Sequence, residues 1–194
     1  MRQVPPTTAL KLMAAADLIA DRGLDSTKIE DFSSVTGIPK ATLYYYFDGK
    51  EEILSYIFGV VLDELGVAVA RGLASDGTAA ERLARVLEAH LAVFETYPKA
   101  SQALYFDLGR AVRRSELASR IRSSYVDPVS ELLSEGVSDG SLRRVEDAGL
   151  SAVAVLGATC TAAIHVLAID PTVSIGRVSQ VIVPLVLQGL ESEE

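Results

Sequence analysis

The sequence contains few of the residues on which disulfide scaffolds and metal sites depend. It has one cysteine, Cys160, and two histidines among 194 residues. A single cysteine cannot form an intramolecular disulfide, which excludes a secreted protein held together by a disulfide framework. No group of His, Cys and carboxylate residues has the close spacing of a metal site, so we expect no metal ion and no cofactor.

Motifs of catalysis are also missing from the sequence. It contains neither a glycine-rich phosphate loop nor a nucleophile elbow. Cys160 and His165 are five residues apart on one expected helix, a spacing that does not bring the two side chains together as a dyad. We therefore expect a protein that is not an enzyme.

Positive charge is scarce. The chain has 18 Lys and Arg against 26 Asp and Glu, a net charge of −8. This balance argues against a protein that coats nucleic acid non-specifically, because such binding depends on neutralising phosphates. It leaves room for a small DNA-reading patch, whose affinity would be modest, sensitive to salt and dependent on where each cation is placed.

One apolar stretch, Ala148–Ile169, is long enough to cross a bilayer and has no formal charge when His165 is neutral. Polar residues such as Ser151 and Thr159 interrupt it, and no aromatic belt or one-sided basic cluster flanks it. We expect a helix buried in a core or an interface, and no membrane partner. The N-terminal segment lacks the apolar core of a signal peptide, which predicts a cytoplasmic protein.

Apolar residues recur at helical spacing nearly everywhere, and no alternating strand pattern is present. We predict an all-α fold of about nine helices. Thr27 and Glu30 have the spacing of a capping box at the start of the second helix, and Pro128 is expected to kink the seventh. The expected ranges are 7–22, 27–36, 40–47, 50–73, 79–97, 99–109, 116–137, 146–168 and 175–191.

The second and third of these helices have the pattern of a helix-turn-helix. Gly37 allows the tight turn between them, and Pro39 can occupy the first turn of the third helix. Tyr44, Tyr45 and Tyr46 cannot all point inward, because successive helical residues turn by about 100°. At least one of these hydroxyls is therefore expected to reach solvent or DNA.

Three segments, 27–32, 36–47 and 50–54, together resemble the DNA-binding signature of the TetR (tetracycline-repressor-like) family. The resemblance implies a helix-turn-helix DNA-binding domain at residues 1–49 and a ligand-binding and dimerisation domain at residues 50–194. Two positions depart from the usual pattern: Pro39 and Gly49 stand where serine is common. The DNA contacts that the resemblance implies are Lys28, Thr36, Lys40, Ala41, Thr42, Tyr44, Tyr45, Tyr46 and Lys50.

The same resemblance implies an effector pocket and a homodimer interface in the second domain. Aromatic and polar residues on the fifth to seventh helices suit an apolar or aromatic ligand held by a few hydrogen bonds, although a residue of this kind, taken alone, is more often an ordinary core residue. The candidate pocket residues are His90, Phe94, Tyr97, Tyr105, Phe106 and Tyr125. The candidate interface residues, which could instead bury one another within one chain, are Val153, Gly157, Thr161, Ile164, Val178, Ile182 and Leu185.

These features predict a ligand-responsive transcriptional regulator, with a repressor favoured over an activator. It would bind a palindromic double-stranded operator as a homodimer and be released by a small-molecule effector through a population shift. The alternative is a helical dimer that binds a protein partner and no DNA, and its support is the acidic balance of residues 1–55, with six basic and eight acidic side chains.

Overall fold

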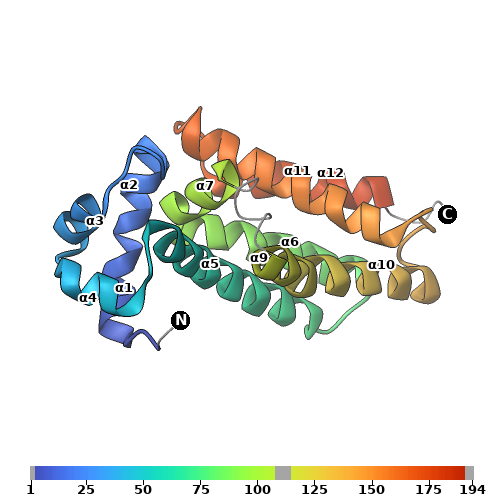
Figure 1. Ribbon diagram of the computed structural model, residues 1–194. Coiled ribbons are helices and arrows are strands. Elements are labelled where there is room, and N and C mark those ends of the chain that lie inside the picture. Colours follow the sequence, from blue (N-terminus) through green and yellow to red (C-terminus); the bar gives the residue numbers. More distant parts are fainter. Residues whose placement is uncertain (1–2, 108–114, 191–194) are drawn as a thin grey trace. The chain divides into compact units, whose positions relative to one another are not determined.

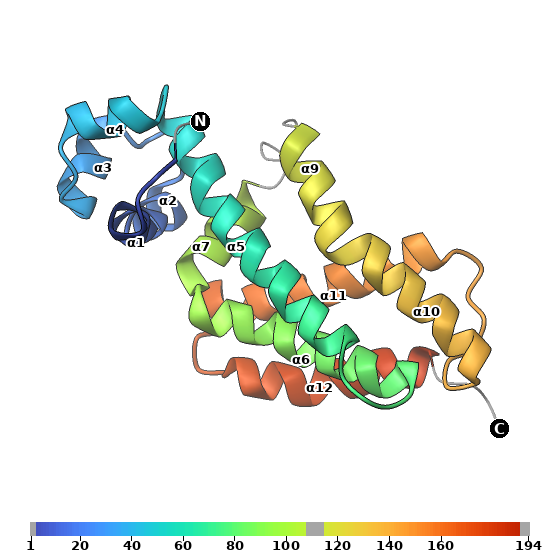
Figure 2. The ribbon, with the colours of Figure 1, turned by 90° about the horizontal axis from the view of Figure 1, so that it is seen from below.

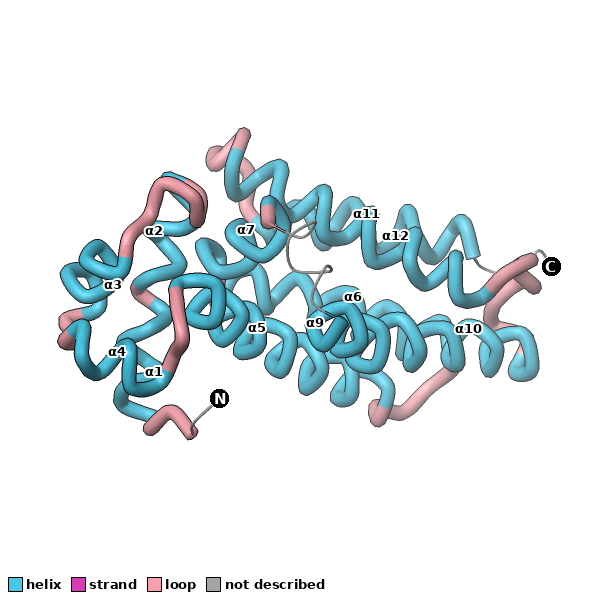
Figure 3. Tube along the Cα trace, viewed as in Figure 1, coloured by secondary structure: helices cyan, strands magenta, loops and turns pink. Residues whose placement is uncertain are grey.

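The computed structural model describes residues 3–107 and 115–190. Within these ranges the secondary structure is helical, apart from turns and one isolated bridge residue, which agrees with the predicted all-α class (Figure 1). Residues 3–107 and 115–190 form nine continuous helices when α1 with α2, and α9 with η1 and α10, are each counted once. The tube in Figure 3 shows short loops between them.

The chain divides into two compact units. The first contains residues 1–61 and 99–117, and the second contains residues 62–98 and 118–194. The predicted boundary at residue 49/50 differs from this division, because the start of α5 (Lys50–Leu73) is joined to the preceding helices. The Phe47 and Tyr56 rings, for example, pack edge to face with centroids 5.7 Å apart.

In the first unit, α1 (Pro6–Met13), α2 (Ala15–Arg22), α3 (Ile29–Thr36) and α4 (Lys40–Tyr46) surround a small apolar core, and α7 (Pro98–Phe106) also contributes to the unit. A single residue, Ala14, separates α1 from α2, where the sequence predicts one helix. The core is formed by Leu12, Ile19, Phe32, Leu43 and Phe47, each at most 2% exposed.

The N-cap of α3 lies one residue later than predicted. The carboxylate of Asp31 accepts a hydrogen bond from the Lys28 N–H at 2.8 Å, so Lys28 occupies the N-cap position. The Thr27 hydroxyl instead donates backwards to the Gly23 carbonyl at 2.8 Å. The predicted Thr27–Glu30 capping box is therefore wrong, because Asp31 serves the following register.

In the second unit, α6 (Ala79–Thr96) packs against α10 (Asp127–Asp139), α11 (Ala148–Ala168) and α12 (Ile175–Leu190) (Figure 2). The helix that enters α10 is irregular: α9 (Ser115–Ile121) leads into a π-helical turn, η1 (Arg122–Val126). Pro128 follows this turn, and proline disrupts the regular hydrogen bonding of the preceding turn. The predicted irregularity thus takes the form of a π turn.

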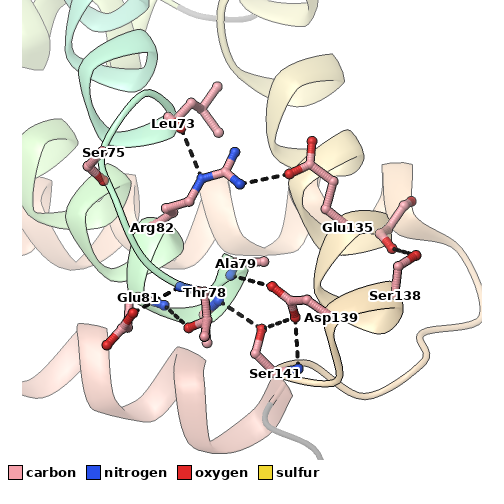
Figure 4. Close-up of polar contacts among 12 residues, drawn as sticks. Leu73, Ser75, Thr78, Ala79, Glu81, Arg82, Glu135, Ser138, Asp139 and Ser141 are labelled. Atoms are coloured by element: carbon pink, nitrogen blue, oxygen red, sulfur yellow. Dashed lines mark hydrogen bonds and ion pairs between the residues drawn. The ribbon is translucent and has the colours of Figure 1, made fainter.

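Polar contacts join the N-terminus of α6 to the C-terminus of α10 (Figure 4). Asp139 accepts a hydrogen bond from the Ala79 N–H at 2.8 Å, and Arg82 pairs with Glu135 at 2.8 Å. Thr78 and Glu81 form a capping box at the same helix end. Hydrogen bonds from Ser141 and Ala79 lower the pKa of the Asp139 carboxyl, as expected for a carboxylate at a helix N-terminus.

Two helices of the described chain, α5 and α11, have the length and mean hydropathy (1.9 for each) of a membrane span. Core helices of soluble proteins have the same length and composition, so these values alone do not indicate a membrane. Only 33% of the apolar window in α11 is buried. The apolar surface that this helix exposes therefore requires another explanation.

Candidate nucleic-acid interface

The turn between α3 and α4 is held by its own side chains. The Thr36 hydroxyl donates to the Phe32 carbonyl at 2.7 Å and accepts from the Ile38 N–H at 3.2 Å. Ser33 donates to the Ile38 carbonyl at 2.7 Å, and Gly37 has φ +65°, the left-handed conformation that glycine adopts easily. Thr36 is buried, so the structure places this predicted DNA contact inside the turn.

The predicted recognition helix, α4, presents a polar and aromatic face. Leu43 points into the core, whereas Tyr44 and Tyr45 are each 58% exposed. This confirms the expectation that the three tyrosines do not all point inward. The other predicted contacts on α4 are exposed at Lys40 and Ala41 and of intermediate exposure at Thr42 and Tyr46.

Tyr46 is held by its neighbours along the helix. Its ring lies edge to face with Tyr45, with centroids 5.0 Å apart, and 6.4 Å from the centroid of Phe47. Because Phe47 is fully buried, this contact connects the exposed aromatic face to the core. Such packing restricts the side-chain conformations available to Tyr46.

The cation of α4 is already paired. The Lys40 ammonium lies 2.7 Å from the Glu30 carboxylate of α3, with both side chains more than half exposed. The hydrogen bond from Lys40 is the main reason that the pKa of Glu30 lies below its usual value. A phosphate that binds Lys40 must therefore compete with Glu30. This ion pair is not among the contacts predicted from the sequence.

A hollow of about 140 Å³ lies beside the start of α4. Its lining includes Pro39 and Thr42 from the α4 side and Thr7, Thr8 and Lys11 from α1. These α1 residues are hydroxyl and cation donors of the kind that contact phosphate. Thr7, Thr8 and Lys11 are not among the DNA contacts predicted from the sequence, and they lie about 30 residues or more before α4 along the chain.

Lys50 does not extend freely into solvent. Its ammonium donates hydrogen bonds to the carbonyl oxygens of Leu24 at 2.9 Å, Asp25 at 3.2 Å and Thr27 at 3.1 Å. An ammonium group has three N–H donors, so contacts within the chain use all the donors of Lys50, the predicted phosphate ligand.

Part of the predicted effector site comes together inside the second unit. The His90 ring lies 5.0 Å from Tyr125 and 5.5 Å from Phe94, measured between ring centroids, and its Nε2 lies 3.7 Å from the Cys160 sulfur. His90 and Tyr125 are at most 2% exposed. Neither His90 Nδ1 nor the Tyr125 hydroxyl has a hydrogen-bond partner in the described chain.

The titratable groups of this cluster are uncharged at neutral pH. Burial lowers the pKa of His90 to about 3 and raises the pKa of the Cys160 thiol to about 12. Burial, with Cys160 as a further cause, also raises the pKa of Tyr125. Thr159, whose hydroxyl donates to the Val155 carbonyl at 2.9 Å, acts in the opposite direction on that pKa.

The remaining predicted pocket residues are not part of this cluster. Tyr97 has intermediate exposure, as does Tyr105, and Phe106 is 61% exposed. Tyr105 and Phe106 belong to the first unit, where their rings contact each other with centroids 6.0 Å apart. His90, Phe94 and Tyr125 are therefore the members of the predicted set that the structure brings together.

The predicted dimer residues fall into two groups. Ile164 and Val178 are buried within the chain's own second unit, and Ile182 has intermediate exposure. Val153 and Leu185 are 48% and 61% exposed, and Gly157 and Thr161 are also on the surface. The exposed members extend into a helical stripe on α11 and α12 that also contains Leu150 and Val181.

The fold and the exposed face of α4 define a helix-turn-helix protein with a larger helical second unit. Proteins of this class bind DNA. Comparisons agree with this class. The family model "Bacterial regulatory proteins, tetR family" matches residues 12–57, and "Tetracyclin repressor-like, C-terminal domain" matches residues 76–163. The chain belongs to the TetR family of transcriptional regulators.

Individual relatives support this membership. The chain is 31% identical over 189 residues to the HTH-type transcriptional repressor KstR2 of Rhodococcus jostii, covering 92% of this chain and 88% of the relative. It is 22% identical over 158 residues to the fatty acid metabolism regulator protein of Bacillus subtilis, covering 81% of each. The solved structure of the TetR family regulator PfmR from Thermus thermophilus has a TM-score of 0.80 at 28% identity, covering 93% of this chain and 98% of that chain.

Proposed function

We propose that this regulator binds a palindromic operator as a homodimer and represses transcription until an effector binds its second unit. The observation that carries the DNA-reading role is the exposed face of α4. Lys40, Tyr44 and Tyr45 are exposed on this helix, whereas Leu43 is buried in the core. Hydroxyl and ammonium groups on a recognition helix can bind phosphates and base edges. The relatives are transcriptional regulators. We propose that this chain likewise binds DNA in the cytoplasm and catalyses no reaction.

A second copy of the chain is the proposed cover for the exposed stripe of α11 and α12. Val153, Leu185 and their exposed neighbours form an apolar surface interrupted by small residues such as Gly157, which allow helices to approach closely. Two such helix pairs form a four-helix bundle with two-fold symmetry. This arrangement would present two copies of α4 to two operator half-sites.

The effector proposed for the His90 cluster is a largely apolar molecule with a neutral oxygen acceptor. Because the Cys160 thiol stays protonated and the His90 ring stays neutral, the S–H can donate to Nε2, which leaves the ring proton on Nδ1. Nδ1–H and the Tyr125 hydroxyl are then two buried donors without partners. A keto or hydroxyl oxygen would accept from them, and the cluster offers no cation to a carboxylate.

The names of two relatives agree with an apolar effector. One solved structure with a TM-score of 0.81 at 23% identity is titled as the ketosteroid transcriptional regulator KstR2 of Mycobacterium tuberculosis. The B. subtilis relative is a regulator of fatty acid metabolism. Both names concern molecules with large apolar surfaces.

The DNA-reading role is tested by fluorescence anisotropy with the duplex from the intergenic region upstream of the protein's own gene. We expect saturable binding that weakens with salt and is abolished in a Tyr44→Ala, Tyr45→Ala double variant. A Val137→Ala variant, at an exposed site of α10 in the other unit, is the matched control and should bind normally. Absence of wild-type binding to this duplex and to a selected pool of genomic fragments would refute the proposal.

The dimer is tested by sedimentation velocity on Leu185→Glu. A buried, unpaired carboxylate would separate the subunits, because charges are costly in an apolar interface. The control is Val137→Glu, which places the same charge at an exposed position of α10. A Leu185→Glu protein that remains dimeric would place the interface elsewhere.

A further inference from the structure

Lys50 joins two parts of the first unit that are distant along the chain. The carbonyls that it contacts belong to Leu24, Asp25 and Thr27, in the loop between α2 and α3. Lys50 itself is the first residue of α5, directly after the α4–α5 connection. Its side chain therefore connects the two ends of the segment that contains α3, the turn and α4.

Burial and hydrogen bonds within the loop also hold the segment that Lys50 contacts. Leu24 and Thr27 are each 1% exposed. The Thr27 N–H donates to the Leu24 carbonyl at 3.1 Å, and its hydroxyl donates to the Gly23 carbonyl at 2.8 Å. The Lys50 ammonium adds a second donor to the Leu24 carbonyl and also donates to the carbonyls of Asp25 and Thr27.

The sequence around Lys50 is unfavourable for an anion. Asp48, Glu51 and Glu52 flank it, and the Glu52 carboxylate accepts the Asp48 N–H at 2.6 Å. A phosphate that approached Lys50 would meet these carboxylates, and it would have to replace three hydrogen bonds to backbone carbonyls, two of them partly buried. Both costs favour retention of the internal contacts.

We propose that Lys50 is a positioning residue that closes the helix-turn-helix at both ends, and not a phosphate ligand. The inference rests on the proposed DNA binding. Closing the segment restricts the orientations of α4 relative to the rest of the first unit before DNA is met, which lowers the entropic cost of docking. The DNA phosphates are contacted instead by cations on the outer face, including Lys40.

The salt dependence of DNA binding separates the two roles. Removal of one lysine–phosphate interaction should reduce the slope of log K against log salt concentration by about 0.9. We expect Lys50→Met, which keeps the apolar stem, to weaken binding by about tenfold with the wild-type slope. Lys40→Met, the matched control, should reduce the slope by about 0.9, the contribution of one phosphate contact.

Lys50→Arg provides a second variant that keeps the positive charge. A planar guanidinium retains phosphate binding but does not reproduce the arrangement of three ammonium donors on three carbonyls. We therefore expect Lys50→Arg to weaken DNA binding with an unchanged slope. Amide hydrogen exchange in residues 24–28 should become faster in both variants and remain unchanged in Lys40→Met.

The proposal is overturned if Lys50→Met reduces the salt slope as Lys40→Met does while exchange in residues 24–28 stays at the wild-type rate. It is also overturned if Lys50→Arg binds DNA like the wild type. If the wild-type protein binds no DNA, the proposed function fails. Hydrogen exchange still decides then whether Lys50 holds the loop.

Discussion

The Glu30 carboxylate lies 2.7 Å from the Lys40 ammonium on the exposed side of the helix-turn-helix. The pair places a negative charge beside Lys40, which we propose as a DNA contact. Since the first 55 residues carry six basic and eight acidic side chains, each available cation has a large effect on affinity. If Lys40 contacts DNA as proposed, Glu30 competes with a phosphate for the same ammonium group.

Glu30→Gln is expected to tighten DNA binding by about two- to fivefold, because an exposed ion pair of this type is weak and its removal frees Lys40. Asp127→Asn removes the carboxylate of another exposed pair, with Arg122 at 3.1 Å, from the second unit. Anisotropy at two salt concentrations should show tighter binding in the first variant only. Equal affinity of Glu30→Gln and wild type would mean that Lys40 does not contact DNA.

The pH dependence of the same pair has a defined sign. The pKa of Glu30 is lower in the folded protein than its usual value of 4.5, so the pair stabilises the folded state above that pH. The contribution disappears as the pH falls through the lowered pKa. Acid titration of the Glu30 carboxyl by NMR should give a higher pKa in Lys40→Met than in the wild type, and an equal pKa would show that the pair does not form in solution.

Tyr125→Phe is expected to separate stability from effector response. The change removes a buried hydroxyl without a partner, so the free energy of unfolding should stay constant or rise by about 1 kcal/mol. Release from DNA by a keto-bearing apolar compound should require a higher concentration, because one of its two donors has been removed. Tyr125→Phe with reduced stability and a normal effector response would contradict the proposed role.

His90 should dominate the effect of mild acid on stability. Its pKa falls from 6.5 to about 3 in the folded protein, so the unfolded chain binds a proton between these values and the folded chain does not. Stability is therefore undiminished above pH 6.5 and declines as the pH is lowered from there, by at most about 1.4 kcal/mol per pH unit from this group. His90→Gln should flatten the decline measured by urea unfolding between pH 6.5 and 5. A decline between pH 6.5 and 5 that is as steep in His90→Gln as in the wild type would contradict this assignment.

Gly72→Ala should destabilise the second unit. A Cβ at Gly72 of α5 would lie 2.8 Å from the Val86 nitrogen and 2.9 Å from its Cα, which are backbone atoms of α6. Separating the two helices to admit the methyl group should cost about 1–3 kcal/mol in the free energy of unfolding. Gly189→Ala of α12 has no atom within 4 Å of its new Cβ and should be neutral or slightly stabilising. Equal stability of the two variants would show that α5 and α6 do not approach this closely.

The sequence predicts much of the fold because the determining signals are local. Gly37 identifies the turn, and the apolar spacing around Phe32 and Leu43 identifies the two helices of the motif. The capping register was wrong by one residue because Thr27, Lys28, Glu30 and Asp31 offer overlapping patterns. The hydrogen bond from the Thr27 hydroxyl back to the Gly23 carbonyl selects between them, because it removes Thr27 from the N-cap role.

The site was predictable in part. Exposure of Tyr44 and Tyr45 follows from helical geometry, but the Glu30–Lys40 pair and the carbonyl contacts of Lys50 join residues 10 to 26 positions apart. Sequence spacing does not determine such contacts. The His90–Tyr125–Cys160 cluster likewise depends on helix packing, and on the π turn that contains Tyr125.

Hydroxyl-radical footprinting of the wild-type protein on its operator tests the central claim most directly. A homodimer that reads DNA through α4 should protect two half-sites related by a two-fold axis, with centres separated by about one helical turn or a multiple of it. Protection should disappear in the Tyr44→Ala, Tyr45→Ala double variant. A single protected segment without symmetry, or protection that persists in the double variant, would contradict a dimer that reads its operator through this helix.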